Sequence, residues 1–238
     1  MKRFLFQIII IAIFPLNSLL FSQNIQGSGV IKQEKRNVSG VQYIVNDSPA
    51  KVIVKVGNKE EVIVEGDDNL INIINTYVKN KSLTISTSDV NFISKQSMTV
   101  YITAKDLLGL KVKSSGDIIT SGRINSPKMT VIVDGSGDIK IANILSDLLT
   151  LAVMGSGDVK ISGRTENLEA EISSSGDIDA QLLNANLSNI LIKGSGDCSI
   201  NTSKQTMIKI TGSGDVKLYG KPPIVKQYIT GSGVIRVY

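Results

Sequence analysis

Six aspartates are the residues best placed by type and spacing to do chemistry, because each directly follows a Ser-Gly dipeptide. They are Asp117, Asp138, Asp158, Asp177, Asp197 and Asp215. The serines of these dipeptides lie 18 to 21 residues apart, and a seventh dipeptide is followed by Val234. A glycine-rich turn that carries an aspartate can cradle a phosphate, ligate calcium or reverse the direction of the chain. The residues around each turn decide among these three roles.

The residues on both sides of each Ser-Gly dipeptide alternate in polarity. All fourteen residues three positions before or after these serines are apolar, whereas most residues two or four positions away are polar. A period of two indicates a strand with one buried face, so each repeat contains two strands joined by a tight turn. Glycine suits this turn because it adopts positive φ without a Cβ clash. Second corners are expected at Gly122, Gly163 and Gly220.

A unit of about 20 residues with two short strands cannot bury its own apolar face, so successive units must stack. We therefore predict an all-β fold, a parallel β-helix (β-solenoid) with about 20 residues per coil and Gly-Ser-Gly-Asp turns. Equivalent strands of adjacent coils would pair in parallel, which places each inward side chain above its counterpart in the next coil. Cys198 falls on such an inward row, and we expect a small buried hydrophobe there rather than a reactive thiol.

A phosphate loop requires a helix after its glycines, whereas a strand is expected after each of these turns. Calcium is harder to dismiss, because stacked aspartates would form a column of carboxylates. Lys140, Lys160 and Lys217 lie two residues after an aspartate on the same strand face and would neutralise much of this column. We therefore favour aspartates that cap their own turns by bonding nearby backbone amides, and we expect no cofactor. Asp177 with Asp179 is the best metal candidate, because it lacks such a lysine.

The chain opens with Lys2 and Arg3, followed by an uncharged apolar run that reaches Ser22. This order predicts a secretory signal peptide over residues 1–22, with an uncleaved membrane anchor as the alternative. We expect an exported protein of the periplasm, the cell surface or the medium. A lone cysteine far from the leader predicts neither an internal disulfide nor a lipid anchor. The formal net charge of +5 is too small to predict binding to nucleic acid.

Residues 23–238 are expected to form a single β-helix domain, with irregular strands over 23–105 and regular Ser-Gly-Asp coils over 106–238. The stretch 39–86, above all "VIVEGDDNL" at 62–70, together with the Ser-Gly-Asp series, resembles the "putative auto-transporter adhesin, head GIN domain" family of exported Bacteroidetes proteins. The resemblance implies a β-helix similar in shape to pectin lyases, without their catalytic residues. It also implies a role in adhesion.

Enzyme hypotheses meet several obstacles in the composition. The chain has no histidine, which excludes Ser-His-Asp, Cys-His and histidine-ligated metal sites. Ser48 and Lys51 match the Ser-x-x-Lys spacing of penicillin-binding enzymes, but the companion motifs are missing and Lys51 begins a strand. Asp67 and Asp68 could form a carboxylate pair, although a solvated turn is the better interpretation. The chain also has no tryptophan to stack on sugar rings.

Three hypotheses follow. The first is a non-catalytic binding or adhesion protein whose partner is a cell-surface glycan or protein, with the aspartate ladder as the candidate contact surface. The second is a polysaccharide lyase or hydrolase on a β-helix. The third is an envelope scaffold stiffened by calcium.

The final coil breaks the repeat pattern. Gln227 replaces an inward aliphatic residue, Val234 replaces the outward aspartate, and Tyr228 points outward. An exposed parallel edge invites other strands, and Gly27–Ile31 repeats the Gly-Ser-Gly-Val-Ile of this coil. We hypothesise that a second chain or the N-terminal segment covers Tyr228, Val234 and Tyr238, with a solvated, frayed end as the alternative.

Overall fold

The computed structural model describes residues 24–88, 90–94 and 96–238. The predicted signal peptide over residues 1–22 lies outside the described residues. Among those described, no helix is long and apolar enough to cross a membrane.

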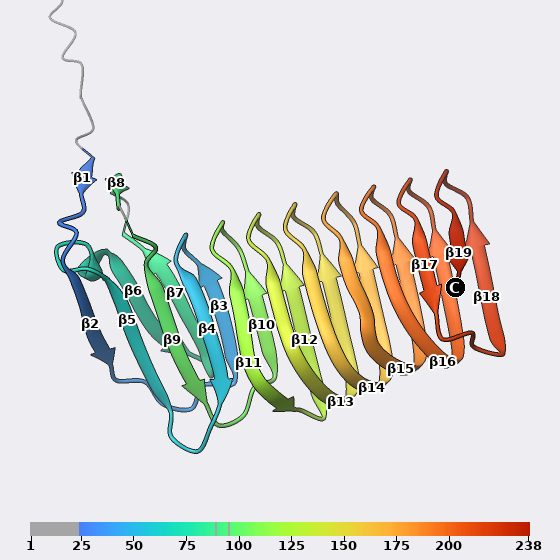
Figure 1. Cartoon of the computed structure of the whole chain (residues 1–238), viewed down its shortest axis with the longest axis horizontal. Coiled ribbons are helices and arrows are strands. Elements are labelled where there is room, and N and C mark those ends of the chain that lie inside the picture. The colour runs from blue at the N-terminus through green and yellow to red at the C-terminus, as the bar shows by residue number, and fades with distance from the viewer. Residues whose placement is uncertain (1–23, 89, 95) are drawn as a thin grey trace, which may run out of the picture.

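The described chain forms an elongated stack of strands that runs from β2 at one end to β18 and β19 at the other (Figure 1). Seventeen strands form one continuous sheet, and β1 and β8 form a separate pair. The strands are β1 (Ile25–Gln26), β2 (Ile31–Arg36), β3 (Tyr43–Asp47), β4 (Lys51–Val56), β5 (Glu61–Asp67), β6 (Ile74–Lys79), β7 (Ser82–Thr87), β8 (Phe92–Ile93), β9 (Thr99–Ala104), β10 (Gly109–Val112), β11 (Ile118–Asn125), β12 (Lys128–Val133), β13 (Ile139–Val153), β14 (Val159–Ile172), β15 (Ile178–Ile192), β16 (Cys198–Ile210), β17 (Val216–Tyr219), β18 (Ile224–Ile229) and β19 (Ile235–Val237).

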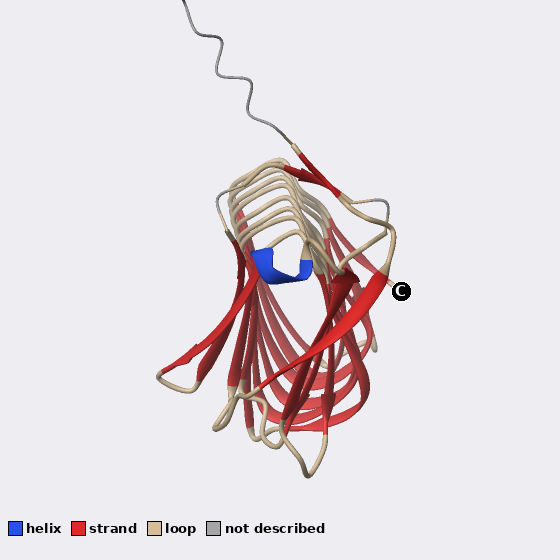
Figure 2. Ribbon diagram, turned by 90° about the vertical axis from the view of Figure 1, so that its left-hand side faces the viewer, coloured by secondary structure: helices blue, strands red, loops and turns tan. Residues whose placement is uncertain are grey.

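The regular coils confirm the predicted parallel β-solenoid. Strands β13 to β16 pair in parallel and bend from one face of the solenoid to the other, so each supplies both walls of its coil (Figure 2). Ile139, Val159 and Ile178 occupy equivalent positions in three successive coils and are all buried. The interior is therefore a set of aliphatic rows, which is what the period-two pattern predicts.

In the N-terminal third, the order of the coils in space differs from their order in the chain. Strands β3 and β4 pair in parallel with β10 and β11 on one side, and with β7 and β9 on the other. The coil formed by β3 and β4, which comes first in the chain, therefore lies between the coil formed by β7 and β9 and the coil formed by β10 and β11. Residues 48–50 join β3 to β4 where later coils have Ser-Gly-Asp.

The N-terminal end of the solenoid is closed by antiparallel strands. On one face β6 runs antiparallel to β7, and on the other β5 runs antiparallel to β9 and is followed by β2. A single 3-10 turn, Ile71–Ile73, lies across the interior between the two faces (Figure 2). Leu70 and Ile71 are fully buried there, so this end of the aliphatic core is plugged by the chain itself.

The glycines of the Ser-Gly-Asp turns were predicted to adopt positive φ, but the structure requires them for a different reason. Positive φ is found at the second corners, at Gly122, Gly163 and Gly220, but not at Gly157. A Cβ built on Gly157 would instead lie 2.2 Å from the carbonyl oxygen of Gly137 in the preceding coil. The turns stack backbone on backbone, and only glycine permits this approach.

Candidate functional site

The six aspartates form a ladder of hydrogen bonds between coils. The Oδ1 atom of Asp138 accepts the backbone N–H of Asp158 at 3.0 Å, and the Oδ1 atom of Asp158 accepts that of Asp177 at 2.9 Å. The same bond begins at Asp117 and continues to the last coil. In the other direction, the carbonyl of Asp158 accepts the N–H of Ile139 at 2.9 Å.

This geometry confirms that the aspartates bond backbone amides, but the amide belongs to the next coil and not to the same turn. Each carboxylate therefore joins two coils. One oxygen of each carboxylate is used in this way, which leaves Oδ2 for side-chain partners.

The expected lysine partners are only partly present. Lys140 pairs with Asp138 in the same coil, with Nζ 3.0 Å from Oδ2, and this contact raises the pKa of Lys140. Lys160 pairs instead with Asp179 of the next coil, also at 3.0 Å. The argument that Asp179 lacks a lysine is therefore wrong, because the neighbouring coil supplies one. Among the described residues, no group of three or more Cys, Asp or Glu side chains could hold a metal ion.

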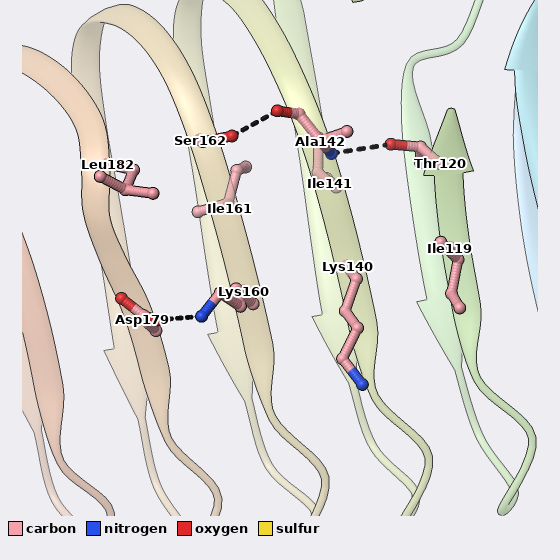
Figure 3. Close-up of a pocket in the computed structure, with 10 residues that line it drawn as sticks. All are labelled: Ile119, Thr120, Lys140, Ile141, Ala142, Lys160, Ile161, Ser162, Asp179 and Leu182. Atoms are coloured by element: carbon pink, nitrogen blue, oxygen red, sulfur yellow. Dashed lines mark hydrogen bonds and ion pairs between the residues drawn. The ribbon is translucent and has the colours of Figure 1, made fainter. Parts of the chain in front are cut away.

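A shallow groove of about 190 Å³ lies beside the ladder, on the outer surface of β11 and β13 to β15 (Figure 3). It is lined by Ile119, Thr120, Lys140, Ile141, Ala142, Lys160, Ile161, Ser162, Asp179 and Leu182. The lining is mostly apolar, with the Lys160–Asp179 ion pair across one end. Leu182 is 66% exposed, which is unusual for a leucine beside a cluster of other aliphatic side chains.

The groove exists because successive coils differ in length. The register between β13 and β14 shifts after Ile141, and the register between β14 and β15 shifts after Lys160. Ser162 Oγ donates to the carbonyl of Ala142 in the preceding coil, and Thr120 Oγ1 accepts the N–H of Ala142 at 3.2 Å. These side chains replace ladder bonds that the shifts interrupt. Sequence reasoning missed the groove, although the uneven repeat lengths were its signal.

Asp67 is not part of a solvated turn, as the sequence suggested, because it is fully buried. Its Oδ1 atom accepts the N–H of Gly29 at 2.7 Å, and its Oδ2 atom accepts the hydroxyl of Ser94. The exposed Asp68 accepts the hydroxyl of Ser28 at 2.5 Å. The "EGDDNL" segment therefore anchors the Gly-Ser-Gly-Val segment near the N-terminus and forms no reactive carboxylate pair.

The two other residues singled out for reactivity are structural. Ser48 is buried and donates its hydroxyl to Oδ1 of Asn46 at 2.7 Å, so it is no Ser-x-x-Lys nucleophile. The thiol of Cys198 is fully buried between Ile178 and Val216. Burial, followed by the nearby charges of Asp177 and Asp197, raises the pKa of this thiol to about 12. The interpretation of Cys198 as a small buried hydrophobe is confirmed.

The terminal coil exposes most of its apolar side chains. Tyr228 and Val234 are exposed, and Tyr238 stacks on Tyr219 of the preceding coil with ring centroids 5.1 Å apart. The N–H of Val234 donates to Asp215 at 2.8 Å, which is the last bond of the ladder. This bond, followed by the contact with Arg236, lowers the pKa of Asp215.

The hypothesis that the N-terminal segment covers the terminal coil is wrong for residues 24–31. This segment pairs with β8 and β5 at the opposite end of the solenoid (Figure 1). The alternative in which a second chain covers the terminal coil stays a prediction.

Comparison with protein families decides the relationship of the chain. Residues 42–222 match the family described as "Putative auto-transporter adhesin, head GIN domain". The chain belongs to this family. The match begins just before β3 and ends after β17, so the family unit includes the coil formed by β3 and β4 as well as most of the Ser-Gly-Asp coils.

Solved structures share this fold along almost their whole length. A "putative adhesin" from Bacteroides fragilis NCTC 9343 is 24% identical, with a TM-score of 0.84 over 90% of this chain and 100% of that one. From Parabacteroides distasonis ATCC 8503, a "putative adhesin" has 21% identity and a TM-score of 0.72. A "putative lipid binding protein" from the same organism has 21% identity and a TM-score of 0.73. Both cover 91% of this chain and 100% of their own. No curated protein matches the sequence.

Proposed function

We propose that this head GIN protein is an exported, non-catalytic binding protein, and that it holds a cell-surface glycan in the groove defined by Lys140, Lys160 and Leu182. The supporting observation is the composition of the groove. Aliphatic side chains form its floor, and a lysine and an aspartate lie at its end. Apolar surface beside paired polar groups suits a sugar ring, which has apolar C–H faces and hydroxyls that both donate and accept hydrogen bonds.

The setting of the groove favours an extended ligand. It runs across successive coils, so a chain of sugars lying along the solenoid axis would contact several coils at once. One outward row crosses the groove beside the aspartate ladder and consists, from coil to coil, of Lys140, Lys160, Asp179, Ser199, Lys217 and Arg236. The mixed charge of this face favours a neutral or mildly charged polymer over a strongly anionic one.

The predicted export leader and a family described as adhesins support a location outside the cytoplasm. We propose that this location is the periplasm or the cell surface, without a lipid anchor. The polysaccharide lyase or hydrolase has less support. The groove places Lys160 and Asp179 in an ion pair at its end. Nothing else in its lining is a titratable pair that could act as acid and base.

The proposal is tested by binding of the purified protein to an array of neutral and acidic polysaccharides, with a matched array of proteins. We expect binding to at least one polysaccharide, with no release of shortened chains. Leu182→Asp should abolish it, because a carboxylate would lie among the aliphatic side chains of the groove. Leu187→Asp is the matched control, because Leu187 is an exposed leucine of the same strand outside the groove. Bond cleavage, binding only to proteins, or equal loss in both variants would each overturn the proposal.

A further inference from the structure

The two ends of the solenoid differ in what they expose. At the N-terminal end the aliphatic core is plugged, and four of the six residues of the edge strand β2 are charged: Lys32, Glu34, Lys35 and Arg36. Charged side chains on an edge strand oppose pairing with other chains. At the C-terminal end β18 is paired along one edge with β16, and it carries a single charge, at Lys226.

The terminal coil also leaves its inward side chains uncovered. Val225, Gln227 and Ile229 lie opposite the buried residues of β16, so they face the solenoid interior. Val225 is 37% exposed and Ile229 is 43% exposed, and Val237 of β19 is 55% exposed. The aliphatic core therefore ends in an open apolar surface, which a second apolar surface of the same shape would cover.

The backbone of β18 has its free hydrogen-bonding groups at these same inward residues. The N–H of Thr230 donates to the carbonyl of Ile210, so the even-numbered residues of β18 point their amides toward β16. The odd-numbered residues, Val225, Gln227 and Ile229, must then point theirs to the free edge, because directions alternate along a strand.

We propose that two copies of this chain associate end to end, with β18 of one pairing antiparallel with β18 of the other about a two-fold axis at Gln227. In this register Val225 lies opposite Ile229 of the second copy, and the two Gln227 residues lie opposite each other. All three are residues with free amides, so the pairing satisfies the free edge of both copies. The inward side chains of the two copies then form one row across the two-fold axis. In this row the two Gln227 side-chain amides lie at the centre, with a pair of Val225 and Ile229 on each side.

Charge and proline favour this register over its neighbours. It places the cationic Lys226 opposite Tyr228 of the second copy on the outer face, so the two lysines do not meet. A register shifted toward the start of the strand would bring in Pro223, which has no N–H to donate. The amide side chain of Gln227, which interrupts the aliphatic row in a single chain, gains a partner of its own kind at the axis.

A cysteine scan tests the register directly. Opposite residues of a hydrogen-bonded antiparallel pair have Cα atoms about 5.5 Å apart, within the span of a disulfide. Gln227→Cys should therefore form a covalent dimer rapidly under mild oxidation. Lys226→Cys is the matched control, because it is exposed but lies away from its symmetry mate. The native Cys198 is buried and its raised pKa keeps it out of the reaction.

A charge exchange tests the pairing in solution by light scattering. The unmodified protein should be a dimer, and Val225→Lys and Ile229→Glu should each be monomeric and still folded, with a lower melting temperature because the stabilisation by pairing is lost. An equimolar mixture of the two variants should form a heterodimer, because the new lysine faces the new glutamate. A monomer at every concentration of the unmodified protein, a series of larger polymers, or equal crosslinking at positions 226 and 227 would overturn the proposal. None of these outcomes depends on glycan binding.

Discussion

The N-terminal third and the regular coils differ in how aspartate side chains hold neighbouring segments together. Both must hold stacked strands together at the edges where the chain reverses. In the regular coils a half-buried or exposed aspartate accepts one amide from the next coil, and this bond is made six times. In the N-terminal third a single buried aspartate, Asp67, holds Gly29 and Ser94 together.

This difference between exposed, repeated aspartates and one buried aspartate indicates which positions tolerate substitution. A repeated, solvent-accessible bond is weak in any one coil, because water can replace a lost partner. A buried carboxylate with two partners has no such substitute, so its loss leaves desolvated polar groups. We therefore expect the stability of the protein to depend on few residues near its N-terminus and on many residues in its coils.

The glycines of the Ser-Gly-Asp turns are an exception, because their substitution should not be tolerated. Replacing one of them gives the largest expected loss of stability. Gly157→Val would push a side chain against the carbonyl of Gly137, so two coils must separate. We expect a loss of about 3 kcal/mol or more in the free energy of unfolding, measured by urea denaturation. Gly122→Ala is the control, because that glycine has a φ of 75° but open space around it, and it should cost about 1 to 2 kcal/mol. Equal losses in the two variants would contradict the close approach of the Gly137 carbonyl as the reason for glycine at position 157.

Asp67 gives the next largest effect. Asp67→Ala removes the acceptor of the Gly29 amide and the Ser94 hydroxyl inside the protein, which should cost about 2 to 3 kcal/mol. Asp68→Ala removes one bond at an exposed position and should cost less than about 1 kcal/mol. Hydrogen exchange should locate the change, with faster exchange confined to residues 27–30 and 94 in the Asp67 variant. Similar losses from both variants would contradict the proposed difference between buried and exposed anchors.

The sequence predicted the solenoid because its signal is repeated. Each inward aliphatic position and each Ser-Gly-Asp turn recurs with every coil, so a single irregular position, such as Gln227, does not hide the period. The sequence correctly predicted that each aspartate accepts a backbone N–H, but the predicted donor lay in the same turn and the actual donor lies in the next coil. Spacing along the chain cannot distinguish an amide in the same turn from one in the next coil, which lies about 4.8 Å away.

The N-terminal third could not be predicted in the same detail, because its contacts occur once. Nothing in the alternation of β3 shows that it pairs with both β7 and β10, since this arrangement joins residues far apart in the chain. Likewise, "GDDN" has the composition of a solvated turn, and the burial of Asp67 arises from the segment that begins at Gly27. The groove depends on register shifts, such as the one after Lys160, that repeat lengths reveal only as a small irregularity.

The smallest expected effect belongs to a single aspartate of the ladder. Asp158→Asn keeps an oxygen that can accept the N–H of Asp177, so the free energy of unfolding should change by less than about 0.5 kcal/mol. Asp158→Ala removes the acceptor at an exposed position, where water can bond the amide, and should cost about 0.5 to 1.5 kcal/mol. The comparison with Asp67 is sharpened by changing Asp138, Asp158 and Asp177 to alanine together. If each carboxylate acts only on its own pair of coils, three losses should add approximately, and the triple variant should approach the cost of Asp67→Ala. A single alanine variant as damaging as Asp67→Ala would show that the ladder acts as one cooperative unit.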